Sequence, residues 1–274
     1  MSEEKNQIKT ISSMVTKFHA GIAAGHMAVS SIVVPSKGGP TLQEAVDMVH
    51  GDDSLTTIVV GKGEHQIDGG YLEISSAMNI VGDPKVSKEK IVVVGGITFE
   101  KGIQGICHLQ HLTLRQATAS GVEGCSSFTM DDVLVEKCVY GVLATGTGVV
   151  GRCTNVEVRQ CKWSGVVARM GASITLVGPK TTVHHNCTRG DSNDYGLKVS
   201  FSASSTIQLV SPLTKKQVST DNGGGGNWGA AYGDGDINSI KTISQEAPQY
   251  DNNTSEKAVG GLGGLGGFEY NLRF

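Results

Sequence analysis

The sequence predicts an all-β solenoid in which short parallel strands are stacked coil upon coil. Three observations support this prediction: the composition, a repeat of twenty-odd residues, and the lack of helical patterns between the repeated segments. Glycine makes up 38 of the 274 residues, whereas aromatic residues make up 5% and charged residues 18%. Because glycine weakens helices, this composition suits a chain that turns often and packs small side chains, not a helical bundle.

The repeat is carried by four five-residue segments in which polar and apolar side chains alternate, apart from one leucine: 111–115, 132–136, 155–159 and 180–184. Their equivalent positions are 21, 23 and 25 residues apart, at Leu112, Val133, Val156 and Thr181. Leucine-rich repeats have a similar period but need a leucine scaffold that this chain lacks. The period therefore indicates stacked β-coils, in which equivalent positions are direct neighbours at a strand spacing of about 4.8 Å.

The segments before the repeat predict two helices and a linker. The first helix is expected over 2–24, because one apolar stripe consists of Ile8, Ile11, Val15, Phe18 and Ile22. It would pack on its own domain or, as the weaker alternative, on a partner. Residues 30–40 predict a linker, and a capping box at 41–44 predicts a second helix before a strand at 57–60.

The composition changes after residue 215, where glycine-rich runs begin. We therefore expect three parts: an N-terminal helix and linker over 1–40, the solenoid over 41–215, and a Gly-rich C-terminal arm over 216–274. The arm would be flexible, or it would dock on a partner. Its candidate anchors are the apolar side chains Trp228, Leu262, Leu265, Phe268 and Tyr270.

Two stretches, 41–63 and 128–142, resemble proteins of the right-handed parallel β-helix, the pectin-lyase-like fold. The first is similar to the capping helix and first coil of many such proteins. The second is similar to the short repeat of copper-accessory periplasmic proteins and eukaryotic F-box β-helix proteins, and to uncharacterised β-helix proteins of algae, protists and large viruses. The resemblance spans about 41–215 and implies the fold, but a fold does not imply an activity.

Enzymes of this fold cleave acidic polysaccharides with motifs that the sequence lacks. Polygalacturonase-like hydrolases carry Asn-Thr-Asp, Gly-His-Gly and Arg-Ile-Lys, and pectate lyases carry Arg-x-Pro-x-x-Arg; none of these occurs here. The resemblance therefore assigns no catalytic residue to this chain. If the protein is an enzyme, the fold implies a glycoside hydrolase or a polysaccharide lyase.

Stacking of the coils predicts columns of outward polar side chains. One column consists of Arg115, Glu136, Arg159 and His184, and a second of His111, Asp132, Asn155 and Lys180. Between them lie Thr113, Leu134, Glu157 and Thr182. The alternating charges are explained by cross-strand ion pairs on a solvated face, or by a shallow groove for a sugar chain or a partner.

If the groove is catalytic, Glu136 and Glu157 are the candidate acid and base. Diagonal neighbours lie roughly 7–8 Å apart, which falls in the range that an inverting glycosidase uses. Arg159 or His184 would then hold a carboxylate of the substrate.

Other motifs are weaker. A metal site at His184 and His185 would need Asp191 and Asp194 as further ligands, and we predict no metal and no cofactor. The G-x-G-x-x-G match at 146–151 precedes a strand instead of a helix, and the calcium-loop match at 234–238 lacks its sixth-position glycine.

The six cysteines form no C-x-x-C pair and are expected as buried free thiols. Of these, Cys138 and Cys161 would stack with Asn186.

The net charge of −3 does not indicate a nucleic-acid partner. No basic apolar leader opens the sequence, and no apolar run approaches the roughly 20 residues of a membrane span, so we expect a soluble intracellular protein.

The predicted function is a non-catalytic solenoid that binds a protein partner or serves an assembly through its terminal segments. The alternative is a carbohydrate-active protein that binds, hydrolyses or eliminates polysaccharide on the charged face. The candidate binding residues are Arg115, Asp132, Glu136, Glu157, Arg159, His184, Trp228 and Phe268.

Overall fold

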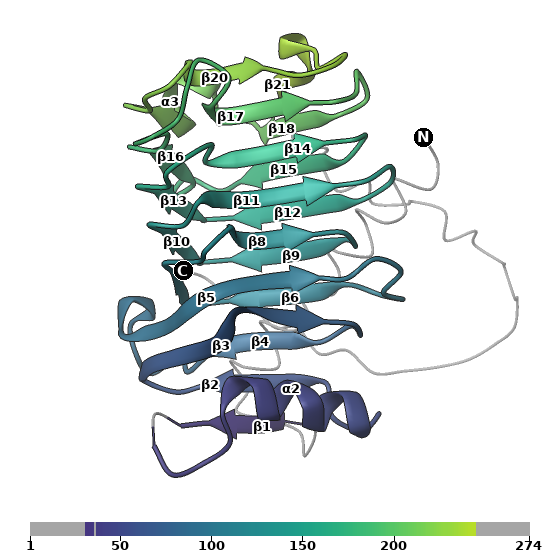
Figure 1. The fold of residues 1–274 in the computed structure, drawn as a ribbon, viewed down its shortest axis with the longest axis vertical. Helices are drawn as coiled ribbons and strands as arrows, with labels where there is room; N and C mark the ends of the chain where they lie inside the picture. Colours follow the sequence, from purple (N-terminus) through teal and green to yellow (C-terminus); the bar gives the residue numbers. More distant parts are fainter. Residues whose placement is uncertain (1–30, 36, 245–274) are drawn as a thin grey trace, which may run out of the picture. The chain divides into compact units, whose positions relative to one another are not determined.

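The structure of the protein is a computed structural model, and it describes residues 31–35 and 37–244. The helix expected over 2–24 lies outside the described residues, as do the candidate anchors Leu262, Leu265, Phe268 and Tyr270. The described chain forms a stack of parallel strands, with β1 at one end and β21 at the other (Figure 1). The predicted all-β parallel β-helix is therefore confirmed.

Two sheets make up the stack. The first, sheet A, contains nine strands in the order β1 (Ser31–Val34), β2 (Thr57–Val60), β4 (Asn79–Gly82), β6 (Cys107–Gln110), β9 (Phe128–Asp131), β12 (Val150–Thr154), β15 (Ser173–Val177), β18 (Thr206–Val210) and β21 (Ile240–Ile243). Sheet B contains twelve strands and divides into two faces.

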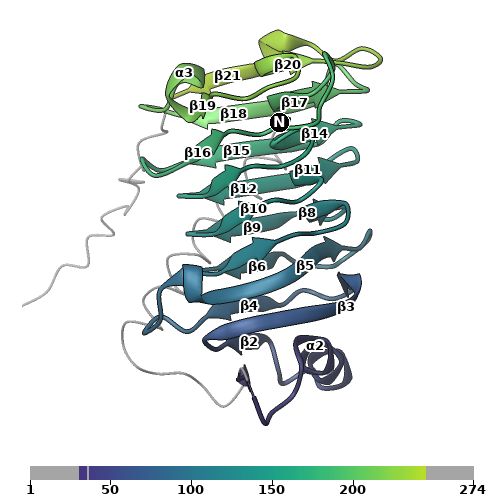
Figure 2. The ribbon, with the colours of Figure 1, turned by 60° about the vertical axis from the view of Figure 1, so that its left-hand side comes forward.

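The short-strand face consists of β7 (Thr113–Arg115), β10 (Leu134–Glu136), β13 (Glu157–Arg159), β16 (Thr182–His184) and β19 (Ser219–Thr220). The long-strand face consists of β8 (Ser120–Gly124), β11 (Tyr140–Thr145), β14 (Val166–Arg169), β17 (Tyr195–Ser200) and β20 (Gly226–Ala230). Two longer strands, β3 (Gly63–Ile74) and β5 (Ile91–Phe99), pair with each other (Figure 2), and β5 pairs with both β7 and β8. The two faces are thus continuous at this end of the stack.

The predicted register is confirmed on the short-strand face. Val135 pairs with Val158, which pairs in turn with Val183, and all three are buried. The coils are also joined at Val133 and Val156, whose carbonyl oxygens accept hydrogen bonds of 3.0 Å from the amides of Glu157 and Thr182. Alternation therefore directs one side of each strand into a continuous core.

The chain turns at three corners per coil, and the first residue of nearly every corner has a left-handed backbone. After sheet A these residues are His111, Asp132, Asn155 and Gly178, and after the short-strand face they are Gln116, Lys137, Gln160, His185 and Asp221. At the second corner the next residue points inward, which places Cys138, Cys161 and Asn186 in one buried ladder as predicted. Asn186 Oδ1 accepts from the amide of Cys161 at 3.1 Å.

The described cysteines are free, as expected, and five of the six are buried. Burial raises the pKa of Cys107 and Cys138 to about 11 and that of Cys153 and Cys187 to about 12. The thiolate that redox chemistry requires is therefore scarce at neutral pH.

Four short helices complete the described chain: α2 (Leu42–Gly51), η1 (Lys88–Lys90), α3 (Lys215–Val218) and η2 (Ile237–Ser239). The capping box of α2 is present, with Thr41 Oγ1 accepting from the Glu44 amide and a Glu44 carboxylate oxygen accepting from the Thr41 amide. None of these helices has the length and apolar character needed to cross a membrane.

The β-helix extends beyond the expected limits of 41–215. Strand β1 lies in the expected linker, and β19, β20 and β21 lie in the expected arm. The glycine run near residue 224 is not a flexible spacer but allows close packing. A Cβ atom added to Gly225 or Gly229 would lie 2.5 or 2.3 Å from Cε1 of Tyr195. Glycine is needed at these positions because the ring of Tyr195 leaves no room for a side chain. The sequence alone does not reveal this contact.

Candidate functional site

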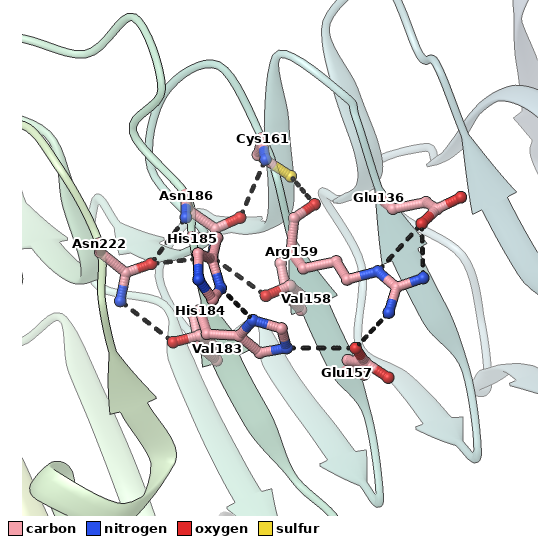
Figure 3. A network of polar contacts seen from close by, with 10 residues as sticks. All are labelled: Glu136, Glu157, Val158, Arg159, Cys161, Val183, His184, His185, Asn186 and Asn222. Carbon is pink, nitrogen blue, oxygen red and sulfur yellow. Dashed lines mark hydrogen bonds and ion pairs between the residues drawn. The ribbon is translucent and has the colours of Figure 1, made fainter.

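The predicted charged column is assembled on the short-strand face. Arg115 pairs with Glu136, which pairs with Arg159, and Arg159 pairs with His184. Glu157 lies in the neighbouring column, opposite Leu134 and Thr182. The ion pairs of this column form one network, which Figure 3 shows from Glu136 to His185.

Glu136 is the centre of the network. Its Oε1 accepts from Arg115 Nε at 2.8 Å, and its Oε2 accepts from Arg159 Nε at 3.0 Å and Nη2 at 2.9 Å. Burial alone would raise the pKa of Glu136, but the hydrogen bonds and charges of Arg159 and Arg115 outweigh it and hold this pKa below its usual value. The side chain is only 5% exposed. Glu136 is therefore a carboxylate whose two oxygens are both occupied.

Glu157 continues the network toward the histidines. Its Oε1 accepts from Arg159 Nη1 at 2.9 Å and lies 3.1 Å from His184 Nε2. A carboxylate only accepts, so Nε2 of His184 carries a proton. The other ring nitrogen of His184, Nδ1, lies 2.7 Å from Nδ1 of His185.

This geometry is unfavourable for the proposed acid and base. A general acid of a glycosidase needs a raised pKa, and its proton must reach the leaving oxygen. Glu136 and Glu157 instead share the guanidinium group of Arg159, and the pKa of Glu136 is lowered. The column acts as a cross-strand ion-pair network that joins four coils.

The second predicted column is paired in part. Asp132 Oδ1 accepts from Lys88 Nζ at 2.7 Å, and Oδ2 lies 2.6 Å from His111 Nδ1. Burial opposes the charge of Asp132, but Lys88 and His111 hold its pKa below the usual value. Asn155, which is half-buried, accepts at Oδ1 from the amide of Lys180 at 3.4 Å.

The remaining candidates do not form sites. Asp194 does not join the two histidines, since its Oδ1 accepts from Ser164 Oγ and Lys198 Nζ on the long-strand face. Among the described residues no group of three or more His, Cys, Asp or Glu is placed to hold a metal. The 146–151 motif forms a corner and the start of β12, and Asp236 caps η2 by accepting from the amide of Asn238 at 2.9 Å.

The expected anchor Trp228 lies within the β-helix. It lies on β20 in register with Leu197 and packs against the core, with Lys215 Nζ 5.6 Å from the ring centroid. Its side chain is therefore part of the last coil and is not presented on an arm. Phe268, the other anchor assigned to the binding set, lies outside the described residues.

The long-strand face carries a group of aromatic side chains that the sequence did not reveal. Tyr140 and Trp163 meet edge to face, with ring centroids 5.0 Å apart, and Phe201 and Tyr232 stack with centroids 5.4 Å apart and planes 15° apart. Trp163, Phe201 and Tyr232 are 41%, 49% and 48% exposed. We call these four residues the aromatic surface.

Polar groups lie beneath and between these rings. Lys198 Nζ lies 4.8 Å from the centroid of Tyr232 and 3.2 Å from Asp194 Oδ1. Ser164 Oγ donates to the same oxygen at 2.9 Å. Burial raises the pKa of the Tyr140 hydroxyl, and the nearby charge of Asp194 raises it further. The face thus combines exposed rings with fixed hydrogen-bonding groups.

Comparisons with known proteins identify neither a family nor an activity. No family model matches the sequence, and no curated protein matches it. Among solved structures, the chain is similar to two structures of one protein, the catalytic domain of GH87 alpha-1,3-glucanase in complex with tetrasaccharides. Each match has 13% identity and a TM-score of 0.47. Each alignment covers 80% of this chain and 46% of the other, so the chain spans about half the length of that protein. A likeness at this level does not extend to chemistry.

Proposed function

We propose that the protein binds carbohydrate chains on its long-strand face and does not cleave them. The observation that carries this proposal is the aromatic surface: two ring pairs, one at each end of the long-strand face, beside buried hydrogen-bonding groups. Tyr and Trp rings present an apolar face together with a polar tip, so they suit ligands that alternate C–H and hydroxyl groups. A sugar ring is such a ligand, because its C–H face packs on an aromatic ring while its hydroxyls form hydrogen bonds.

The pairing of the carboxylates on the two faces supports the proposal that the protein does not cleave its ligand. A hydrolase of the two-carboxylate type needs one raised pKa and one free carboxylate facing the scissile bond. On the short-strand face Glu136 is enclosed by two arginines, and Glu157 is bonded to Arg159 and His184. On the long-strand face Asp194 is paired with Lys198, and Glu123 lies 3.5 Å from Arg169.

Trp163→Ala is expected to weaken binding of a retained glycan by about tenfold, because an exposed ring that stacks on the ligand contributes on the order of 1.4 kcal/mol. A glycan array and affinity electrophoresis would first identify the glycan, and titration calorimetry would compare the variants. The matched control is Met48→Ala, which truncates a side chain of similar exposure (50%) on α2.

A reducing-sugar assay and an assay for unsaturated lyase products complete the test. We expect neither product, and unchanged binding in the Glu136→Gln, Glu157→Gln double variant. Product formation that this double variant abolishes would return catalysis to the charged column. Failure of every glycan to be retained would remove the proposal.

Binding of a protein partner or an assembly through the terminal segments stays a separate prediction. The structure changes its test, because truncation at residue 216 would remove β19, β20 and β21. The informative comparison in a pull-down is the full chain against a chain that ends at Ser244.

A further inference from the structure

The third corner of the coils, between the long-strand face and sheet A, differs from the other two. Its equivalent positions are Gly146, Met170, Phe201 and Tyr232, and all four have a left-handed backbone, with φ of 108°, 55°, 61° and 62°. We call Met170, Phe201 and Tyr232 the apolar corner. We propose that this corner is the recognition element of the glycan site, and that its ligand is a neutral glycan, not a uronate or sulfated one; this rests on the proposed function above.

The left-handed backbone of the apolar corner does not explain why Met, Phe and Tyr occur there. Left-handed conformations favour glycine and, among other residues, Asn, Asp and His, whereas a bulky residue there is uncommon and strained. At the other two corners the first left-handed residue is polar or glycine, although Gln and Lys occur there beside Asn, Asp and His. Cys187, inside the corner after β16, is left-handed as well. At the apolar corner large apolar side chains occupy the same conformation. Strained residues of this kind persist where function selects them.

The exposure of the apolar corner is equally unusual. Met170, Phe201 and Tyr232 are 50%, 49% and 48% exposed, and none of them belongs to the buried core. The rings of Phe201 and Tyr232 are held nearly parallel, and the amide of Phe201 donates to the carbonyl of Tyr232 at 2.8 Å. Successive rungs thus form a preorganised apolar platform along the edge of the aromatic surface.

The charges of the long-strand face decide the class of ligand. Its five strands contain two basic residues, Arg169 and Lys198, and one acidic residue, Glu123. Arg169 lies 3.5 Å from Glu123, and Lys198 lies 3.2 Å from Asp194, which immediately precedes β17. Two cations and two anions cancel, and no cation of these strands lacks a carboxylate partner.

A polyanionic glycan would therefore find no unpaired cation within the five strands of this face. Two lysines lie outside these strands: Lys162, next to Trp163 in the sequence, and Lys215, whose Nζ is 5.6 Å from the ring centroid of Trp228. Its carboxylates would approach Asp194 and Glu123, and like charges brought together are unfavourable. The short-strand face is balanced in the same way, because Arg115 and Arg159 are paired with Glu136 and Glu157. A neutral glycan pays no such penalty and keeps its contacts with the rings.

Phe201→Asn is the variant that separates binding from folding. Asparagine adopts the left-handed conformation readily, so we expect the variant to unfold at the same temperature as the wild type or above it. We expect its affinity for the retained neutral glycan to fall by about tenfold or more. The control is Gln160→Asn. Gln160 is an exposed left-handed residue at the corner after the short-strand face, and we expect its replacement to change neither the unfolding temperature nor the affinity. Retained affinity in Phe201→Asn, with Gln160→Asn also unchanged, would overturn the role of the apolar corner.

The ligand class is tested on the full chain with defined glycans: laminarin, dextran and cello-oligosaccharides as neutral probes, and polygalacturonate, alginate and heparin as anionic ones. We expect a neutral probe to bind at least about tenfold more tightly than any anionic one, and its affinity to be unchanged between about 50 and 500 mM salt. Tighter, salt-sensitive binding of an anionic probe would overturn the inference while the proposed function stands. Retention of none of the probes would overturn both.

Discussion

Lys198→Met is expected to lower the free energy of unfolding by about 3–5 kcal/mol, because it leaves the carboxylate of Asp194 buried without its cation. The side chains of Lys198 and Asp194 are only 4% and 12% exposed, although both belong to an outward face. The variant also removes the cation 4.8 Å from the ring of Tyr232. Chemical denaturation followed by far-UV circular dichroism measures the change.

The double variant Lys198→Met, Asp194→Asn is the matched control. It removes both charges and leaves an amide oxygen that can still accept from Ser164, so we expect it to recover a large part of the lost stability. A loss below about 1 kcal/mol in the single variant would show that the pair is solvated as a surface ion pair is. Equal losses in the single and double variants would show that the charge imbalance is not the cause.

The protein is expected to lose stability as the pH falls below about 5, and Glu136 to account for part of that loss. The pKa of Glu136 lies below its usual value of 4.5 in the folded state, so the folded protein binds fewer protons than the unfolded chain. Its contribution is therefore complete above the unfolded pKa and is lost as the pH falls through the folded one. Asp132, with its lowered pKa, adds a contribution of the same sign.

Glu136→Gln isolates this contribution. At pH 7 it leaves Arg115 and Arg159 without their shared carboxylate, which we expect to cost about 2–3 kcal/mol. The difference from the wild type should shrink as the pH falls below 4.5, because the unfolded wild-type chain takes up a proton at Glu136 before the folded state does. Glu123→Gln serves as control, since its pair with Arg169 is longer, at 3.5 Å, and more exposed, so a cost below about 1 kcal/mol is expected. A difference at Glu136 that does not vary with pH would contradict the assignment.

The stack and the charged column were predictable because they depend on register alone. A strand has a period of two, so one buried valine series fixes the outward neighbours on adjacent coils. Val135, Val158 and Val183 therefore placed Glu136 beside Arg159 without knowledge of any turn. The degree of pairing was not predictable. It depends on the side-chain conformation by which Arg159 reaches both Glu136 and Glu157, and a repeat pattern does not specify that.

The aromatic surface was missed because its members do not recur at the regular spacing of twenty-odd residues. Trp163 lies in a corner, and Phe201 and Tyr232 are 31 residues apart, since the coil between them is lengthened. Phe201 and Tyr232 share a conformational signal. Each follows the end of a long-strand segment, at the position that Gly146 holds in an earlier coil. The glycine there indicates a left-handed site, and a phenylalanine at an equivalent site conflicts with local preference.

Because β3 and β5 run across both faces, the two ends of the stack are joined differently. Near the N-terminus a single strand passes through the bend between faces, so those turns of the spiral are bound together as one block. Farther along, the strands of each turn form ladders only with those of the preceding and the following turn, and they shorten to the two residues of β19. We therefore expect that whole turns can be added or removed more easily near β21 than near β3 and β5, in evolution or by engineering.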